Sequence, residues 1–169
     1  MAPPPPSQTL KTAVLFLKLV TFASLLASVI ILTTNTAFLV LNRVDFEVHF
    51  KDVYAYKYTL STIVMGMAYT LVQIAFSIHY IGTGNYITTG DGILTFDFYG
   101  DKIVSYVLTT RAGATFRVTR DVKSIVETLG DIEEKFFDKA YACGSLILIA
   151  FVCTAMLSVY SSYSLPKRI

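Results

Sequence analysis

The sequence predicts an all-α membrane protein, a four transmembrane helix bundle whose helices are joined by polar loops. Three observations predict it: 54% of the 169 residues are hydrophobic, only 15% are charged, and the apolar residues are gathered into long runs. A soluble domain has roughly 45–50% apolar and about 25% charged residues, so this composition is typical of a chain solvated by lipid. We expect one domain over residues 12–163, between tails at 1–11 and 164–169.

Three apolar runs are long enough to cross the bilayer, since a helix needs roughly 20 residues to span about 30 Å of hydrocarbon. They are residues 12–33, 58–81 and 140–163. The first run contains a single charge, Lys18, and the last contains none. The proline-rich start of the chain is not the basic region of a signal peptide, so we expect the first helix to be retained.

The span predicted at residues 101–117 is weaker in hydropathy. It contains Asp101, Lys102 and Arg111, and translocon scales assign about 2.5–3.5 kcal/mol to each such charge at a helix centre. Without this helix, however, residues 86–137 would form one loop of unusual length for a compact protein. The small residues at 112–114 also suit a buried helix interface. We therefore expect a helix here, shielded by the other three.

The loop at residues 117–139 is mixed in charge, and its apolar residues recur at helical spacing. This pattern predicts a short amphipathic helix lying on the membrane surface. The alternative is an ordinary solvated loop.

The orientation of the bundle stays open at this point. Lysine and arginine are more numerous in the first and third loops, which by the positive-inside rule would place the tails outside. The same loops carry matching acids, whereas the tails end in unopposed cations.

The residues that could carry chemistry do not form a catalytic set. His49 and His79 have no partner at motif spacing, and no zinc-protease, P-loop or dinucleotide-binding motif occurs. Cys143 and Cys153 lie ten residues apart in one run, about 15 Å along a helix, too far to bridge each other. We expect no catalytic residue, metal or cofactor, and hence no enzyme. A net charge of +2 without a basic cluster also argues against a nucleic-acid partner.

Ionisable residues within the spans are the stronger functional signal, because a charge in a bilayer is costly and by default implies a function or a partner. Lys18 and Asp101 lie at similar depth if both helices enter from the same side, which predicts a salt bridge between them. Alternatively, Lys18 reaches out to the headgroups and Asp101 lies in water. Arg111 lies about 15 Å beyond Asp101, and we expect it to face the bundle and meet Gln73.

Small and polar residues in the spans indicate where helices pack. In lipid, association depends on close packing of small residues and on hydrogen bonds between helices. The helix-packing candidates are Gly66, Gly113, Gly144 and Ser158. We expect part of this surface to meet a neighbouring copy and form lateral homo-oligomers; the alternative is that the monomer itself uses all of it. A second hypothesis is a small channel or transporter subunit with Lys18, Asp101 and Arg111 along a polar pathway, which the lack of internal prolines in the spans disfavours.

Several segments in order along the chain carry a family resemblance. They are residues 16–18 and 33–35 in and after the first helix, 54–58 and Gln73 at the second, 100–106 at the third, and 137–140 before the fourth. With this order and spacing, the chain resembles the plant Casparian strip membrane domain protein-like (CASP-like) family, small four-helix proteins of MARVEL-related architecture. An intramembrane arginine–aspartate pair of that family maps to Lys18 and Asp101. This chain departs from the pattern in having lysine for arginine, and Arg111 where small residues are expected.

The resemblance implies a plasma membrane protein with both termini cytosolic, which would make the amphipathic helix extracellular. It also implies assembly into homo- and hetero-oligomeric platforms, so that the partners are the protein itself and related family members, in contact with membrane lipids. In the best-known members the platforms recruit wall-modifying enzymes, so extracellular wall-associated proteins are further expected partners. The leading hypothesis is a non-catalytic scaffold.

Overall fold

The computed structural model describes residues 8–41, 44–49, 54–83, 92–129, 131–132 and 134–164, which contain four helices and three strands. The helices are α1 (Gln8–Thr33), α2 (Tyr54–Thr83), α3 (Gly92–Leu129) and α4 (Glu134–Ser164). The strands are β1 (Thr36–Leu41), β2 (Val44–His49) and β3 (Asp131–Ile132). The predicted four-helix fold is confirmed.

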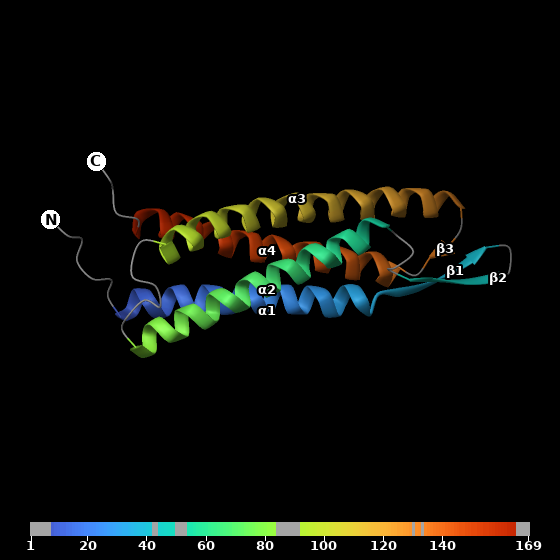
Figure 1. Ribbon diagram of the computed structural model, residues 1–169. Coiled ribbons are helices and arrows are strands. Elements are labelled where there is room, and N and C mark those ends of the chain that lie inside the picture. The colour runs from blue at the N-terminus through green and yellow to red at the C-terminus, as the bar shows by residue number, and fades with distance from the viewer. Residues whose placement is uncertain are drawn as a thin grey trace.

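The four helices run lengthwise as one bundle (Figure 1). Each packs on two neighbours, in the closed order α1, α2, α3, α4 and back to α1. The start of α1 and the end of α4 lie together at one end of the bundle, here called the tail end, and the strands lie at the opposite, sheet end (Figure 1). Helices that follow one another in the chain are therefore antiparallel.

Among the described residues, three helices are long and apolar enough to cross a membrane. The segments are Thr12–Thr33, Tyr54–His79 and Lys135–Tyr163. Helix α3 is not one of them, in agreement with the weak hydropathy of the sequence there. Its place in the bundle comes from packing: Leu108 and Ala112 are buried against the other helices, while Ile103 is exposed. The prediction that α3 is held by its neighbours agrees with this arrangement.

The extent of α3 differs from the prediction of a span at 101–117 followed by a separate surface helix. Residues 117–129 are helical, but they continue α3, which is 38 residues long. Neither glycine nor proline occurs between Gly113 and Gly130, so nothing in the sequence ends the helix at 117. Val118 and Val122 pack against the core, and Lys123 lies over the ring of Phe137 on α4. At 1.5 Å per residue α3 is about 57 Å long, well beyond the roughly 30 Å of hydrocarbon.

A small antiparallel sheet at the sheet end was not predicted. Strands β1 and β2 pair from Thr36↔His49 to Leu41↔Val44, and β3 pairs with the other edge of β1. The strand order is β2-β1-β3. The sheet thereby joins the segment after α1 to the connection between α3 and α4.

The core of the bundle is apolar across its middle. Leu25, Ile63, Leu108 and Ile147, one from each helix, are almost completely buried. These four residues are called the middle layer below. Gly66 lets α1 approach α2 here, because a Cβ at this glycine would lie 3.2 Å from Leu25 Cδ1. Polar side chains meet on either side of the middle layer, and the larger group lies toward the tail end.

Candidate functional site

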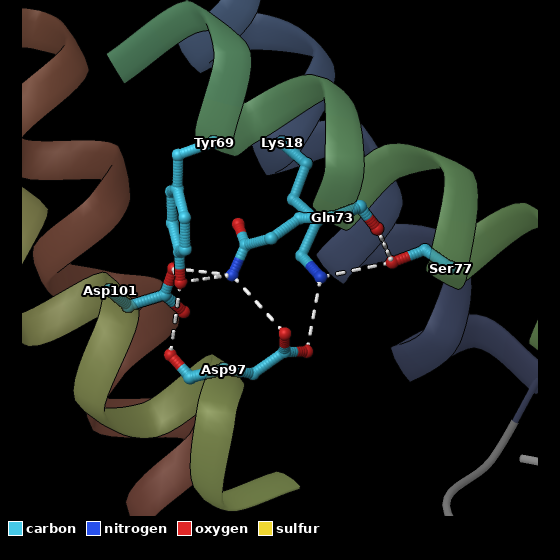
Figure 2. Close-up of polar contacts among 6 residues, drawn as sticks. All are labelled: Lys18, Tyr69, Gln73, Ser77, Asp97 and Asp101. Carbon is cyan, nitrogen blue, oxygen red and sulfur yellow. Dashed lines mark hydrogen bonds and ion pairs between the residues drawn. The ribbon is translucent and has the colours of Figure 1, made fainter. Parts of the chain in front are cut away.

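Polar side chains from three helices meet inside the bundle (Figure 2). Their positions along the helices place them on the tail-end side of the middle layer. They come from α1, from one face of α2 and from the second and third turns of α3. The side chains belong to six residues, here called the polar network: Lys18, Tyr69, Gln73, Ser77, Asp97 and Asp101. Lys18, Gln73 and Asp101 are each at most 3% exposed.

Lys18 is held by α2 and α3 together. Its Nζ donates to Ser77 Oγ at 2.9 Å and forms an ion pair with Asp97 Oδ2 at 3.4 Å. Ser77 in turn donates to the backbone oxygen of Gln73 at 2.8 Å. Lys18 therefore does not reach water as an isolated charge; it links all three helices.

The direct partner of Lys18 is thus Asp97, and not Asp101 as the sequence suggested. Asp97 and Asp101 lie one helical turn apart on the same face of α3. Asp97 is the one nearer the tail end, and its Oδ2 lies within ion-pair distance of Lys18. Asp101 joins the same network through side chains of α2. The predicted link between the first and third helices exists, but it is displaced by one turn.

Asp101 receives its hydrogen bonds from α2. Gln73 Nε2 donates to Asp101 Oδ1 at 2.7 Å, and the Tyr69 hydroxyl donates to the same oxygen at 3.1 Å. Gln73 Nε2 also lies 3.4 Å from Asp97 Oδ1, so this one amide bridges both carboxyl groups. The second oxygen of Asp101, Oδ2, is buried and has no hydrogen-bond partner within the described part of the chain.

Gly100 allows Tyr69 to reach Asp101. A Cβ at position 100 would overlap the hydroxyl and ring of Tyr69. The tyrosine ring also lies 6.0 Å from that of Phe96, one turn earlier on α3. Gly100 is therefore part of the site, because its lack of a side chain leaves room for the Tyr69 ring that bonds to Asp101.

The comparisons with known proteins agree with this architecture. Residues 7–153 match the family model of the Casparian strip membrane protein domain. The chain belongs to the CASP-like family. It is similar to CASP-like protein 4D1 of Ricinus communis, with 56% identity over the full length of both chains. It is also similar to CASP-like protein 4D2 of Arabidopsis thaliana, with 42% identity over 99% of each chain. No solved structure shows a significant match.

Arg111 of this CASP-like chain does not meet Gln73, contrary to the expectation from the sequence. Its guanidinium lies over the ring of Tyr58 at 5.8 Å, and its side chain is partly exposed. Tyr58 lies about one turn after the start of α2, at the sheet end. Gln73 instead lies beside Asp101, about 15 Å along α3 from Arg111. Arg111 therefore lies about one turn beyond Leu108 of the middle layer, where its cation packs on an aromatic ring near the start of α2.

The four predicted packing residues divide between the inside and the outside of this bundle. Gly66 and Gly144 are buried; a Cβ at Gly144 would lie 3.0 Å from the ring of Phe116. Ser158 is half-buried on α4. Gly113 is exposed on α3, and nothing lies within 4 Å of the position of its Cβ. Gly66 and Gly144 therefore pack the monomer, whereas Gly113 faces outward.

A second polar layer joins α2 and α3 beyond the middle layer, toward the sheet end. The Tyr56 hydroxyl and Thr119 Oγ1 lie 3.0 Å apart, and the hydroxyls of Thr59 and Thr115 lie 3.3 Å apart. Within the described residues, no three histidine, cysteine or acidic side chains gather as metal ligands would. The described polar side chains inside this CASP-like bundle contact one another across helices through hydrogen bonds and the ion pair of Lys18 with Asp97.

Proposed function

We propose that this CASP-like protein is a non-catalytic plasma membrane scaffold that self-associates laterally through α3. It organises a membrane domain, or recruits cell-wall-related partners. The observation that carries the proposal is the outward surface of α3, the one helix of the bundle that is not apolar enough to cross a membrane by itself. Tyr106, Thr109, Thr110 and Gly113 are exposed there at helical spacing. These four residues are called the outer face of α3.

The outer face of α3 has the properties of a helix contact. At Gly113 no atom limits the approach of another backbone. The hydroxyl of Thr110 donates to the backbone oxygen of Tyr106 at 2.6 Å, so its methyl group is free to pack. Helices in lipid associate through small residues of this kind, because there is little hydrophobic drive between them. A second copy placed here would cover the least apolar helix of the bundle.

Other small residues support this choice of face by being used inside the monomer. Gly66 and Gly144, two of the packing candidates from the sequence, are buried and cannot meet a neighbouring copy, and Thr154 on α4 is buried too. Small residues also remain exposed on the three other helices, but those helices are apolar and lipid solvates them well; examples are Ala23 on α1, Ala68 and Ala75 on α2, and Ser145 on α4. The outer face of α3 is thus the favoured contact.

The alternative function, a channel or transporter subunit, fits the bundle less well. The buried middle layer lies between the polar network and the second polar layer. An ion moving between the two would have to cross four closely packed apolar side chains. We expect purified protein in liposomes to give no ion flux above that of protein-free vesicles; a flux abolished by Asp101→Asn would favour the channel.

The proposed topology puts both tails in the cytosol. The start of α1 and the end of α4 share one end of the bundle (Figure 1), as four crossings require. The sheet and the extension of α3 would then face the cell exterior, where wall-associated proteins could bind. Related family members would join the same platforms through equivalent helices. We also propose that the bundle has the MARVEL-related architecture that the family resemblance implies.

Single-molecule photobleaching tests the scaffold. Fluorescently tagged protein at low density in native-like membranes should bleach in two or more steps. Gly113→Leu should shift the population toward single steps, whereas Ala23→Leu, a matched change at an exposed small residue of α1, should not. Wild-type protein that bleaches almost entirely in one step would overturn the proposal.

A further inference from the structure

The polar network contains more negative than positive charge if its acids are ionised. Lys18 is the one cation, and Asp97 and Asp101 are two carboxyl groups. The side chains of Lys18 and Asp97 are 4% and 18% exposed, and Asp101 is 1% exposed. An unpaired carboxylate is very costly in so apolar an environment, where a buried acid tends to take up a proton instead. The network lacks one positive charge.

The two oxygens of Asp101 have different surroundings. Oδ1 accepts hydrogen bonds from both Gln73 and Tyr69. Oδ2 is buried and accepts none from the described residues. An ionised carboxylate spreads its charge over two oxygens that both need donors, whereas a carboxylic acid has one accepting carbonyl oxygen and one hydroxyl. Oδ1 therefore suits the carbonyl oxygen of an acid, and a neutral hydroxyl without a partner at Oδ2 costs less than a charged oxygen without one.

Among the side chains that the structure describes, no further cation contacts Asp101. Helix α1 brings Lys18, which is paired with Asp97, and the titratable group that α2 brings is the Tyr69 hydroxyl. On α3, Lys102 is exposed and lies 5.7 Å over the ring of Phe98. The described end of α4, from residue 154 to 163, has no charged side chain, and its titratable groups are two tyrosines.

A metal ion does not fit as the missing charge. Calcium takes six to eight oxygen ligands and magnesium about six. Within the described residues no group of three acidic, histidine or cysteine side chains forms. The smallest cation, a proton, needs only the one free oxygen.

We propose that Asp101 is a proton-binding site, which holds one proton on Oδ2 in the folded bundle at neutral pH. The proton comes from water, and its binding converts the carboxylate into a neutral acid. The network then contains the ion pair of Lys18 with Asp97 and a neutral Asp101, with no net charge. This assignment does not depend on self-association, because every group involved belongs to one copy.

Infrared spectroscopy on the full chain in lipid vesicles tests the site, because a protonated carboxyl has a C=O stretching band separate from that of a carboxylate. With ¹³C-labelled aspartate, the wild-type protein at neutral pH should show a protonated carboxyl band with the isotope shift. Asp101→Asn should remove the band. Asp101→Glu keeps a carboxyl group, so its band should remain but lose the isotope shift, which covers the case in which Asp101→Asn does not fold.

Two further variants separate Asp101 from its neighbours. Asp97→Asn removes the surplus negative charge, so Asp101 should ionise opposite Lys18 and the band should disappear. Asp121→Asn, at an exposed acid of the same helix, is the matched control and should leave the band unchanged. Wild-type protein without an isotope-shifted band at neutral pH would overturn the proposal, as would a shifted band that persists in both Asp101 variants.

Discussion

Lys18 on α1 and Asp97 on α3 form an ion pair inside the bundle, with Nζ and Oδ2 3.4 Å apart although 79 positions separate them in the sequence. Helices α1 and α3 are not neighbours around the ring of the bundle. The pair therefore ties together two helices that pack mainly on others, and it does so next to Ser77 of α2. The stability of the tail end should depend on it.

A double-mutant cycle on this pair should show strong coupling. Lys18→Met leaves Asp97 without its cation, and breaking a buried pair from one side costs about 3–5 kcal/mol. The double variant Lys18→Met with Asp97→Asn should lose less than the sum of the single changes. The measurement is the free energy of unfolding in a mixed-detergent titration. Lys102→Met, at an exposed lysine, is the control; additive losses would mean that the pair does not stabilise the fold.

Two glycines of α3 should respond in opposite ways to the same change. Gly100→Ala pushes Tyr69 away from Asp101, and we expect a loss of about 1–3 kcal/mol from overpacking. Gly113→Ala meets open space and improves helix propensity, so stability should stay equal or rise by up to about 1 kcal/mol. Thermal unfolding in detergent compares them. Equal effects at both positions would contradict the described contact of Gly100.

Arg111 and Gln73 should contribute independently. Gln73→Leu removes the amide that bridges both carboxyl groups and should cost about 1–3 kcal/mol. Arg111→Leu removes a contact with Tyr58 that is worth about 0.5–1 kcal/mol at an exposed site. The unfolding free energy of the double variant should equal the sum. A coupling above about 0.5 kcal/mol would indicate that the two side chains meet, as the sequence suggested.

Cysteine labelling should report the proposed topology. Gln8→Cys and Ser164→Cys lie at the tail end and should react with a membrane-impermeant maleimide only after the cells are opened. Thr36→Cys, at the start of β1, should react in intact cells. The wild-type chain is the background control, since Cys143 and Cys153 are buried. Labelling of the tail-end cysteines from outside would reverse the orientation.

The fold could be predicted because apolar runs of spanning length dominate this sequence. The three runs in α1, α2 and α4 are long enough to span by themselves, and the gap they leave requires a further helix. The sheet was missed although β2 alternates apolar and polar residues from Val44 to His49, the period of a strand. That signal is only six residues long, and it lies between two spans, where a connecting loop is expected.

The site was predicted in part for a similar reason. Lys18, Gln73 and Asp101 were singled out because buried charge and amide groups need partners, and all three lie in the polar network. The prediction lacks Asp97 because the predicted third span begins at Asp101. The spacing of four between the two acids was the available signal. The partner of Arg111 depends on the relative position of α2 and α3 along the bundle axis. The amino-acid composition does not determine that position.

Cross-linking at the outer face of α3 tests the central claim, lateral self-association of the scaffold, most directly. Gly113→Cys in the full chain, in native membranes at low expression, should give a covalent dimer under a mild oxidant. The wild-type chain and Ala23→Cys, a matched exposed site on α1, should remain monomeric under the same conditions. A chain with cysteine at position 113 that forms no dimer, or no more than the cysteine at position 23, would contradict the account.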